Sequence, residues 1–113
     1  MLLNLSNHPS ATWTDQQMKA AGGRVIDLPF PAVAPDGDEN YIEALAQEYY
    51  DKILAMKDIK TVHIMGEMNF TYALVNKLKA AGIRCVASTT KRETVEENGV
   101  KISRFSFVMF RKY

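Results

Sequence analysis

The sequence predicts an α/β fold of three layers, in which helices cover both faces of a mainly parallel β-sheet. Apolar runs of strand length alternate three times with segments of helical periodicity, which is typical of right-handed β–α–β units. The runs are almost wholly apolar, as in strands buried on both faces. A C-terminal antiparallel hairpin follows. We therefore expect one domain over residues 1–113, with five strands in the spatial order 2-1-3-4-5, numbered along the chain.

The apolar runs and the helical segments can be placed in chain order. Strands are expected at residues 2–6, 25–28, 61–65 and from residue 83 onward. Helices are expected at residues 14–21, from about 39 to 56, and from about 69 to 81. Thr14 and Gln17 have the spacing of a capping box, Asp38 is placed to cap the second helix, and Gly82 ends the third.

Asn98-Gly99 is the strongest short-range signal for a two-residue hairpin turn. With this pair as the turn, Glu96 opposes Lys101 and Glu93 opposes Arg104, and two opposite-charge pairs support the register. The fourth strand therefore continues well beyond residue 88, and the fifth returns beside it. Two cations of this ribbon are left without acidic partners: Lys91 and Arg92.

Composition bounds the class of protein. A chain of 113 residues with 47% hydrophobic and 24% charged residues fits a globular domain with one core. No apolar run approaches the roughly 18 residues of a membrane-spanning helix, and the first residues lack the basic region of a signal peptide. The single cysteine, Cys85, cannot form an internal disulfide and fits a reducing compartment. We expect a cytoplasmic protein.

Charge is distributed unevenly along the chain. Residues 1–83 carry seven Lys or Arg against ten Asp or Glu, whereas residues 84–113 carry seven against three. The basic end is either a solvated face or the anion-attracting side of a site. Double-stranded DNA is not an expected partner, because the rest of the chain is acidic and no recognition helix is evident.

Three predicted strand ends meet at one edge of the sheet. Ligands of open parallel sheets bind beyond the carboxyl ends of the strands where the strand order reverses, here between the first and third strands. Residues 6–8, 66–69 and 88–92 leave the sheet there. The candidate ligand-binding residues are Ser6, Asn7, Gly66, Glu67, Asn69, Ser88, Thr89, Thr90 and Lys91, and the candidate catalytic residues are His8 and Arg92.

These segments offer the groups that bind an anion. Gly66 lets backbone pass close to a ligand, and the helix after it presents free N–H groups and partial positive charge. Hydroxyls and two cations of residues 88–92 would lie alongside. No segment matches a Walker loop or a dinucleotide-binding glycine motif. The pattern predicts a nucleotide or anion site, and we expect neither a metal nor a cofactor.

Several of these residues have a second, structural interpretation. His8 precedes a proline and fits the end of a strand as well as it fits a site. Glu67 can orient a substrate hydroxyl or cap the helix that it precedes, and capping is favoured. His63 lies among apolar residues, which favours a hydrogen-bonded core histidine over a ligand. Thr89 and Thr90 are good strand formers.

The fifth strand is an edge strand that carries Phe and Met side chains. An exposed apolar edge invites pairing with, or burial in, a partner. We therefore predict a homodimer.

Three stretches of the chain resemble small CRISPR-associated accessory proteins of type III systems, the short Rossmann-like families grouped with the ring nucleases. They are LLNLSNH, HIMGEMNFTYALVNKLKAAGI and STTKRETVEENGVKISRFSFVMFRKY. The likeness spans most of the chain and is strongest in STTKR and FVMFRKY. The residues that match the family's three strand-end loops are Asn7 and His8, then Gly66 and Glu67, then Ser88, Thr89, Thr90 and Arg92.

The resemblance implies a homodimer that binds a cyclic oligoadenylate second messenger across its two-fold axis. Some relatives cleave the ring to linear products and so switch off the antiviral response, and others sequester it. Cleavage implies in-line attack of a ribose 2′-hydroxyl on the neighbouring phosphate without a metal, with His8 as general acid or base. Two alternatives stay open: a non-catalytic cyclic-nucleotide-binding sponge or sensor, and a protein-interaction domain with no small ligand.

Overall fold

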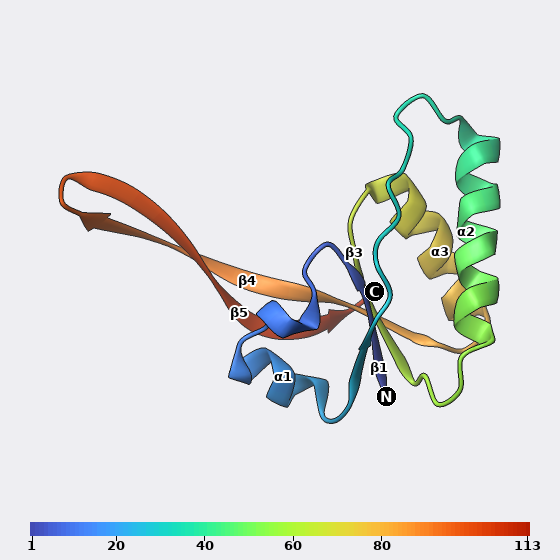
Figure 1. Cartoon of the computed structure of the whole chain (residues 1–113), viewed down its shortest axis with the longest axis horizontal. Helices are drawn as coiled ribbons and strands as arrows, with labels where there is room; N and C mark the ends of the chain where they lie inside the picture. Colours follow the sequence, from blue (N-terminus) through green and yellow to red (C-terminus); the bar gives the residue numbers. More distant parts are fainter.

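The computed structural model describes residues 1–113 and has the predicted order of strands and helices (Figure 1). The elements are β1 (Leu2–Ser6), η1 (Ser10–Thr12), α1 (Asp15–Ala21), β2 (Val25–Asp27), α2 (Glu39–Leu54), β3 (Thr61–Met65), α3 (Met68–Ala80), β4 (Arg84–Glu97) and β5 (Val100–Lys112). They form one sheet in the order β2-β1-β3-β4-β5, with only the β4–β5 pair antiparallel. The predicted α/β fold class and strand order are confirmed.

The helices begin and end at signals in the sequence. The Thr14 side chain accepts a hydrogen bond from the backbone N–H of Gln17 at the start of α1, and Asp38 accepts one from Tyr41 at the start of α2. Gly22 ends α1 with a φ of 72°, in the left-handed region that favours glycine. No helix in the structure has the length and the apolar character that crossing a membrane requires.

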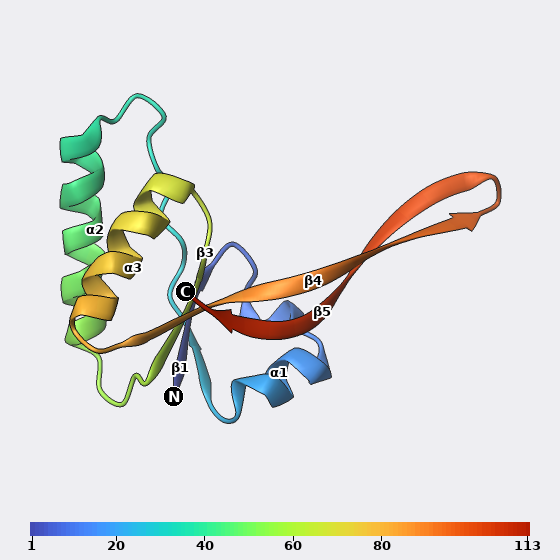
Figure 2. The same ribbon diagram turned by 180° about the vertical axis from the view of Figure 1, so that it is seen from behind.

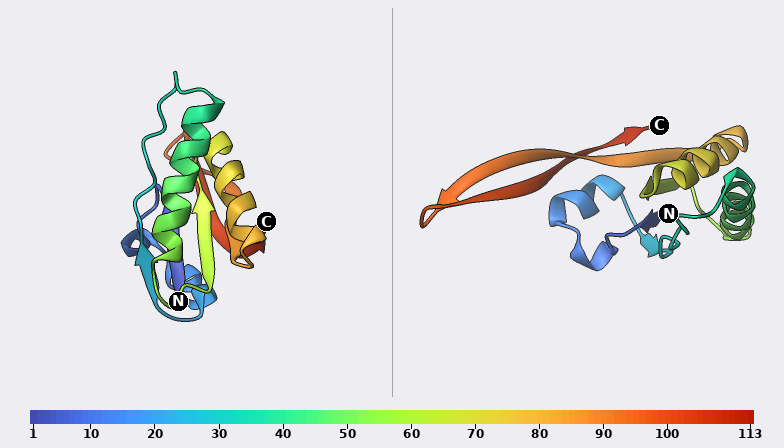
Figure 3. Two further views of the ribbon diagram at one scale, coloured as in Figure 1. Left: turned by 90° about the vertical axis from the view of Figure 1, so that its right-hand side faces the viewer. Right: turned by 90° about the horizontal axis from the view of Figure 1, so that it is seen from above.

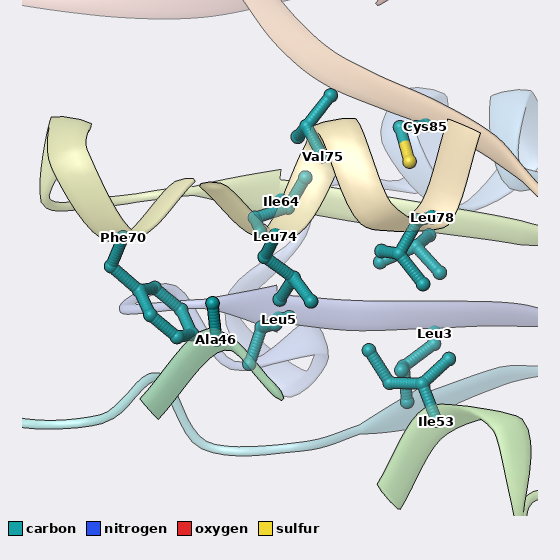
Figure 4. Close-up of a cluster of buried hydrophobic side chains, with 11 residues drawn as sticks. Leu3, Leu5, Ala46, Ile53, Ile64, Phe70, Leu74, Val75, Leu78 and Cys85 are labelled. Atoms are coloured by element: carbon teal, nitrogen blue, oxygen red, sulfur yellow. The ribbon is translucent and has the colours of Figure 1, made fainter. Parts of the chain in front are cut away.

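The main core lies between the sheet and the helix pair α2 and α3 (Figure 4). Side chains alternate between the two faces of a strand, so Leu3 and Leu5 of β1 point to the same face. Ile64 of β3 lies beside them, and Leu74 of α3 packs on top; all four are fully buried. Removing this apolar surface from water is the main stabilising contribution to the fold.

The opposite face of the sheet carries buried polar side chains. Asn4 and Ser6 alternate with the leucines of β1, and His63 occupies the middle of β3. The η1–α1 segment covers this face (Figure 3), and the Trp13 ring packs edge-on against His63 with ring centroids 5.3 Å apart. The almost wholly apolar strands therefore bury one apolar and one hydrogen-bonding face, which the run of leucines and valines did not predict.

β4 and β5 continue as a two-stranded ribbon beyond the rest of the sheet (Figures 1 and 2). β3 pairs with β4 only as far as His63 and Val86, so the ribbon has no further neighbouring strand. We call residues 89–109 the hairpin arm. Because of it the radius of gyration is 15.8 Å, against about 13 Å for a compact domain of this length.

The turn of the hairpin arm has the predicted position. Asn98 and Gly99 have φ values of 53° and 78°, as a type I′ turn requires. The register places both predicted opposite-charge pairs across from each other. It shifts by one residue between Thr89 and Thr90, where Val108 of β5 is the extra residue.

The ion pairs of the arm differ from the prediction. Arg104 bonds to Glu97 at 2.8 Å, and the Lys91 ammonium lies 3.7 Å from the Glu93 carboxylate. The prediction that Lys91 lacks an acidic partner is therefore wrong, because residues two apart in a strand share a face. Arg92 instead donates hydrogen bonds to a serine hydroxyl of β5.

Candidate functional site

The predicted site residues lie around three hollows that share one end of the sheet. His8, Ser88 and Thr90 line a pocket of about 530 Å³ between the base of the hairpin arm and α1, which we call the hairpin pocket. Residues 66–69 border the two other hollows. Met65 lines both the hairpin pocket and the hollow beside Gly66, so the strand ends converge without forming a single cavity.

The hairpin pocket has aromatic walls and hydrogen-bonding groups. Its other lining side chains are Thr12, Trp13, Thr14 and Gln17 from the η1–α1 segment, His63 and Met65 from β3, and Phe105 and Phe107 from the arm. No aspartate or glutamate is among them. Such a lining suits a ligand that offers flat rings and hydrogen-bond acceptors.

A chain of hydrogen bonds runs beneath the pocket from Asp27 to Ser88. The Asn4 amide nitrogen donates to Asp27 Oδ1 and to the His8 carbonyl oxygen, each at 2.9 Å. Both partners are acceptors, so the orientation of the Asn4 amide is fixed and its oxygen faces His63 Nδ1 at 2.9 Å. Nδ1 must then carry the hydrogen, and the lone pair of Nε2 faces Ser88 Oγ at 2.7 Å.

The ionisation of this chain is set by burial and by hydrogen bonds. Burial and, to a smaller extent, the nearby His8 together lower the pKa of His63 to about 4, so the imidazole is neutral at pH 7. Burial alone would raise the pKa of Asp27, but hydrogen bonds from Asn4 and Ser10 outweigh it and lower that pKa. The chain therefore begins with a carboxylate at Asp27 and contains a neutral base, His63, next to its other end at Ser88.

Ser88 is placed where β4 leaves β3 and enters the arm. Its hydroxyl oxygen also accepts a hydrogen bond from the Gln17 amide at 3.3 Å. Its backbone N–H faces the Met65 sulfur at 3.2 Å, which is a weak acceptor.

The turn after β3 is used for packing and capping. The Phe30 ring fills the space where a side chain at position 66 would lie, so any residue other than glycine at this position would force the ring to move. Glu67 accepts hydrogen bonds from the backbone N–H groups of Asn69 and Phe70 at the start of α3. The favoured capping interpretation of Glu67 is confirmed, and its carboxylate occupies donors that were predicted to meet an anion.

The two predicted cations of the arm point to opposite faces of the ribbon. Directly paired residues of neighbouring strands share a face. Arg92 pairs with Phe105, which lines the hairpin pocket, so Arg92 is on the pocket face. Lys91 pairs with Ser106 and lies on the other face. Of the two, only Arg92 is on the pocket face; its guanidinium is bonded to Ser103, and it is not among the groups that line the pocket.

The remaining predicted residues have the following places. Ser6 is buried and donates to the Asn4 amide oxygen at 2.8 Å, so it supports the chain below the pocket. Asn7 is exposed in the turn after β1. Thr89 donates to the Met109 carbonyl across the ribbon at 3.2 Å. Nowhere in the structure do three or more His, Cys, Asp or Glu side chains gather to hold a metal ion.

Comparison with known proteins gives a family and no function. A model described as the uncharacterized protein MJ1673 family matches residues 1–111. The chain belongs to the MJ1673 family. No curated protein and no solved structure matches the chain. The function of this member of the MJ1673 family therefore has to be argued from the geometry of its pocket.

Sequence reasoning missed the centre of the hairpin pocket. Asn4 was counted only as part of an apolar strand, and His63 was interpreted as a core residue, which its two hydrogen bonds confirm without excluding a second role. Each is the third residue of a five-residue strand, and the two are direct partners in the register of β1 and β3. Two polar residues at equivalent positions of neighbouring apolar strands are a signal that could have found this chain.

Proposed function

We propose that the chain binds a cyclic oligoadenylate in the hairpin pocket and cleaves it without a metal, as a cytoplasmic homodimer. The observation that carries the proposal is a pocket with aromatic rings, hydroxyls and imidazoles and with no carboxylate in its lining. Adenine bases stack on aromatic side chains at about 1–3 kcal/mol per base. A lining without carboxylates spares phosphate oxygens a repulsive neighbour.

The proposed roles follow the positions of the side chains. Arg92, on the pocket face of the arm, stabilises the charge on the phosphate that is attacked. His8, at the edge of the pocket, exchanges a proton with the reacting ribose and phosphate oxygens. The free, buried Cys85 fits a reducing compartment, which supports the cytoplasmic part of the proposal.

The homodimer is supported by the hairpin arm. Its exposed apolar side chains include Val100, Phe105, Val108 and Met109, between about half and two thirds accessible. A two-stranded hairpin without further cover is only marginally stable in water. A second copy that covers the arm would bring two pockets into one symmetric assembly, which suits a ligand with internal symmetry.

A turnover assay tests the proposal. The purified protein is incubated with cyclic tetra-adenylate and cyclic hexa-adenylate, with and without EDTA, and the products are separated by chromatography. We expect linear product with a 2′,3′-cyclic phosphate end, in equal amount with EDTA. Binding without product would support the sponge or sensor instead, and neither binding nor product would remove the proposal.

Two arginine variants of the arm give a matched comparison. Arg92→Ala removes a cation on the pocket face, and Arg104→Ala removes one on the opposite face. We expect Arg92→Ala to weaken binding about tenfold, which corresponds to about 1.4 kcal/mol, and Arg104→Ala to have little effect. If Arg92→Ala and His8→Ala both leave turnover intact, the proposed roles are wrong.

A further inference from the structure

Ser88 and His63 form the only hydrogen bond between a side-chain hydroxyl and an imidazole in the molecule, and both line the hairpin pocket. The Ser88 oxygen and His63 Nε2 are 2.7 Å apart, a distance at which a proton can pass between them. Ser88 is only partly buried, so its hydroxyl is open to a ligand in the pocket, whereas His63 lies behind it, only 2% exposed.

The hydrogen-bond partners on the other side of His63 determine which of the two groups donates in the Ser88–His63 hydrogen bond. Asp27 and the His8 carbonyl orient the Asn4 amide, and Asn4 in turn accepts the Nδ1 hydrogen of His63. Nε2 therefore has only a lone pair to offer, and Ser88 must donate its hydrogen to it. A hydroxyl whose hydrogen points at a neutral imidazole, itself oriented by a third group, is the arrangement of an activated nucleophile or proton acceptor.

We propose that Ser88 and His63 together are the base of the pocket, and that Ser88 takes the proton of the attacking ribose 2′-hydroxyl as it passes its own proton to His63 Nε2. This inference rests on the proposed cleavage of a cyclic oligoadenylate. It gives Ser88 and His63 a catalytic role and makes Asn4 a positioning residue. Because Ser88 and His63 then act as the base, His8 at the edge of the pocket acts as the general acid.

In this step one bond to phosphorus forms, another breaks, and each proton passes to a named group. The 2′-oxygen forms a bond to phosphorus, the bond from phosphorus to the 5′-oxygen breaks, and the 5′-oxygen takes a proton from His8. The 2′-hydroxyl proton moves to Ser88, and the Ser88 proton moves to His63. His63 then returns its proton to Ser88, the extra proton leaves to solvent, and solvent restores the proton of His8.

Reaction with a sulfonyl fluoride tests the activated hydroxyl without the messenger. Phenylmethylsulfonyl fluoride forms a bond between Ser88 Oγ and sulfur, releases fluoride and leaves the proton on His63. We expect one adduct per chain, mapped to Ser88 by peptide mass spectrometry. His63→Gln keeps a hydrogen-bonding side chain but removes the base, and should slow labelling at least tenfold. Ser106→Ala, on the opposite ribbon face, should label as the wild-type protein does.

The same variants in the turnover assay separate the two proposals. Thermal melts first confirm that Ser88→Ala and His63→Gln are folded. Labelling at Ser88 together with loss of turnover by at least a hundredfold in Ser88→Ala supports the inference. Labelling without any turnover in the wild-type protein overturns the proposed cleavage but leaves the activated serine established. No labelling at Ser88, or full turnover in Ser88→Ala, overturns the inference itself.

Discussion

His63 is a buried ionisable residue that the fold holds in its neutral form. Its Nδ1 hydrogen is donated to Asn4 and its Nε2 lone pair accepts from Ser88, so both ring nitrogens are satisfied only without a second proton. Trp13 and Phe110 pack against the ring at 5.3 and 5.4 Å and keep water away. Together these contacts explain why the pKa of His63 falls to about 4.

The low pKa of His63 predicts how stability depends on pH. An unfolded histidine gains a proton as the pH falls below about 6.5, whereas the folded His63 gains one only near pH 4. The stabilisation is therefore complete above pH 6.5 and is lost progressively between about pH 6.5 and 4, in total about 3 kcal/mol. Urea unfolding at pH 7 and pH 4.5 measures this change.

A glutamine at position 63 provides the control for this prediction. The difference in unfolding free energy between pH 7 and 4.5 should be larger in the wild-type protein than in His63→Gln, because the other titrating groups are common to both. An equal pH dependence in the two proteins would contradict the burial of a neutral His63.

The position of His63 in a strand was predictable from its own segment, but its partners were not. Its hydrogen bonds join residues 59 and 25 positions away in the chain. No local spacing records such contacts, because they depend on the register of β1, β3 and β4. Glu67, by contrast, was predicted as a cap because its partners are the next two or three residues.

The hairpin arm projects beyond the rest of the sheet, so the other elements do not cover most of its surface. β4 has 14 residues and β3 has 5, so most of β4 can pair only with β5. The Asn-Gly pair predicted the turn, and the unequal strand lengths account for the projection. The register shift at Thr89 and Thr90 was not predictable, because these two threonines and the facing Phe107 and Val108 are all good strand formers.

The exposed arm predicts self-association. At tens of micromolar, sedimentation should show a dimer, and Val108→Asp should shift it toward monomer, because a charge would be buried in the interface. Tyr72→Ser is the matched control, since Tyr72 is exposed on α3, away from the arm. A clean wild-type monomer at this concentration would contradict the homodimer.

The whole molecule combines an apolar core on one face of the sheet (Figure 4) with the buried, hydrogen-bonded side chains of Asn4, Ser6 and His63 on the other. The alternation of strands and helices predicted the sheet order because each β–α–β unit is a local pattern. The hairpin pocket could not be predicted in the same way, since its walls come from the η1–α1 segment, β3, and both strands of the arm. The pocket lies beyond the ends of β1 and β3 and beside the part of β4 that has left β3, at the expected edge of the sheet.

The most direct test of the account is to map where a cyclic oligoadenylate binds. Titration into isotope-labelled protein, followed by NMR, should shift the indole N–H signal of Trp13 and the backbone amides of Ser88 and Thr90, which belong to the hairpin pocket. Shifts confined to the exposed surface of α3 around Tyr72, or no shifts at all, would contradict the assignment of this pocket as the binding site.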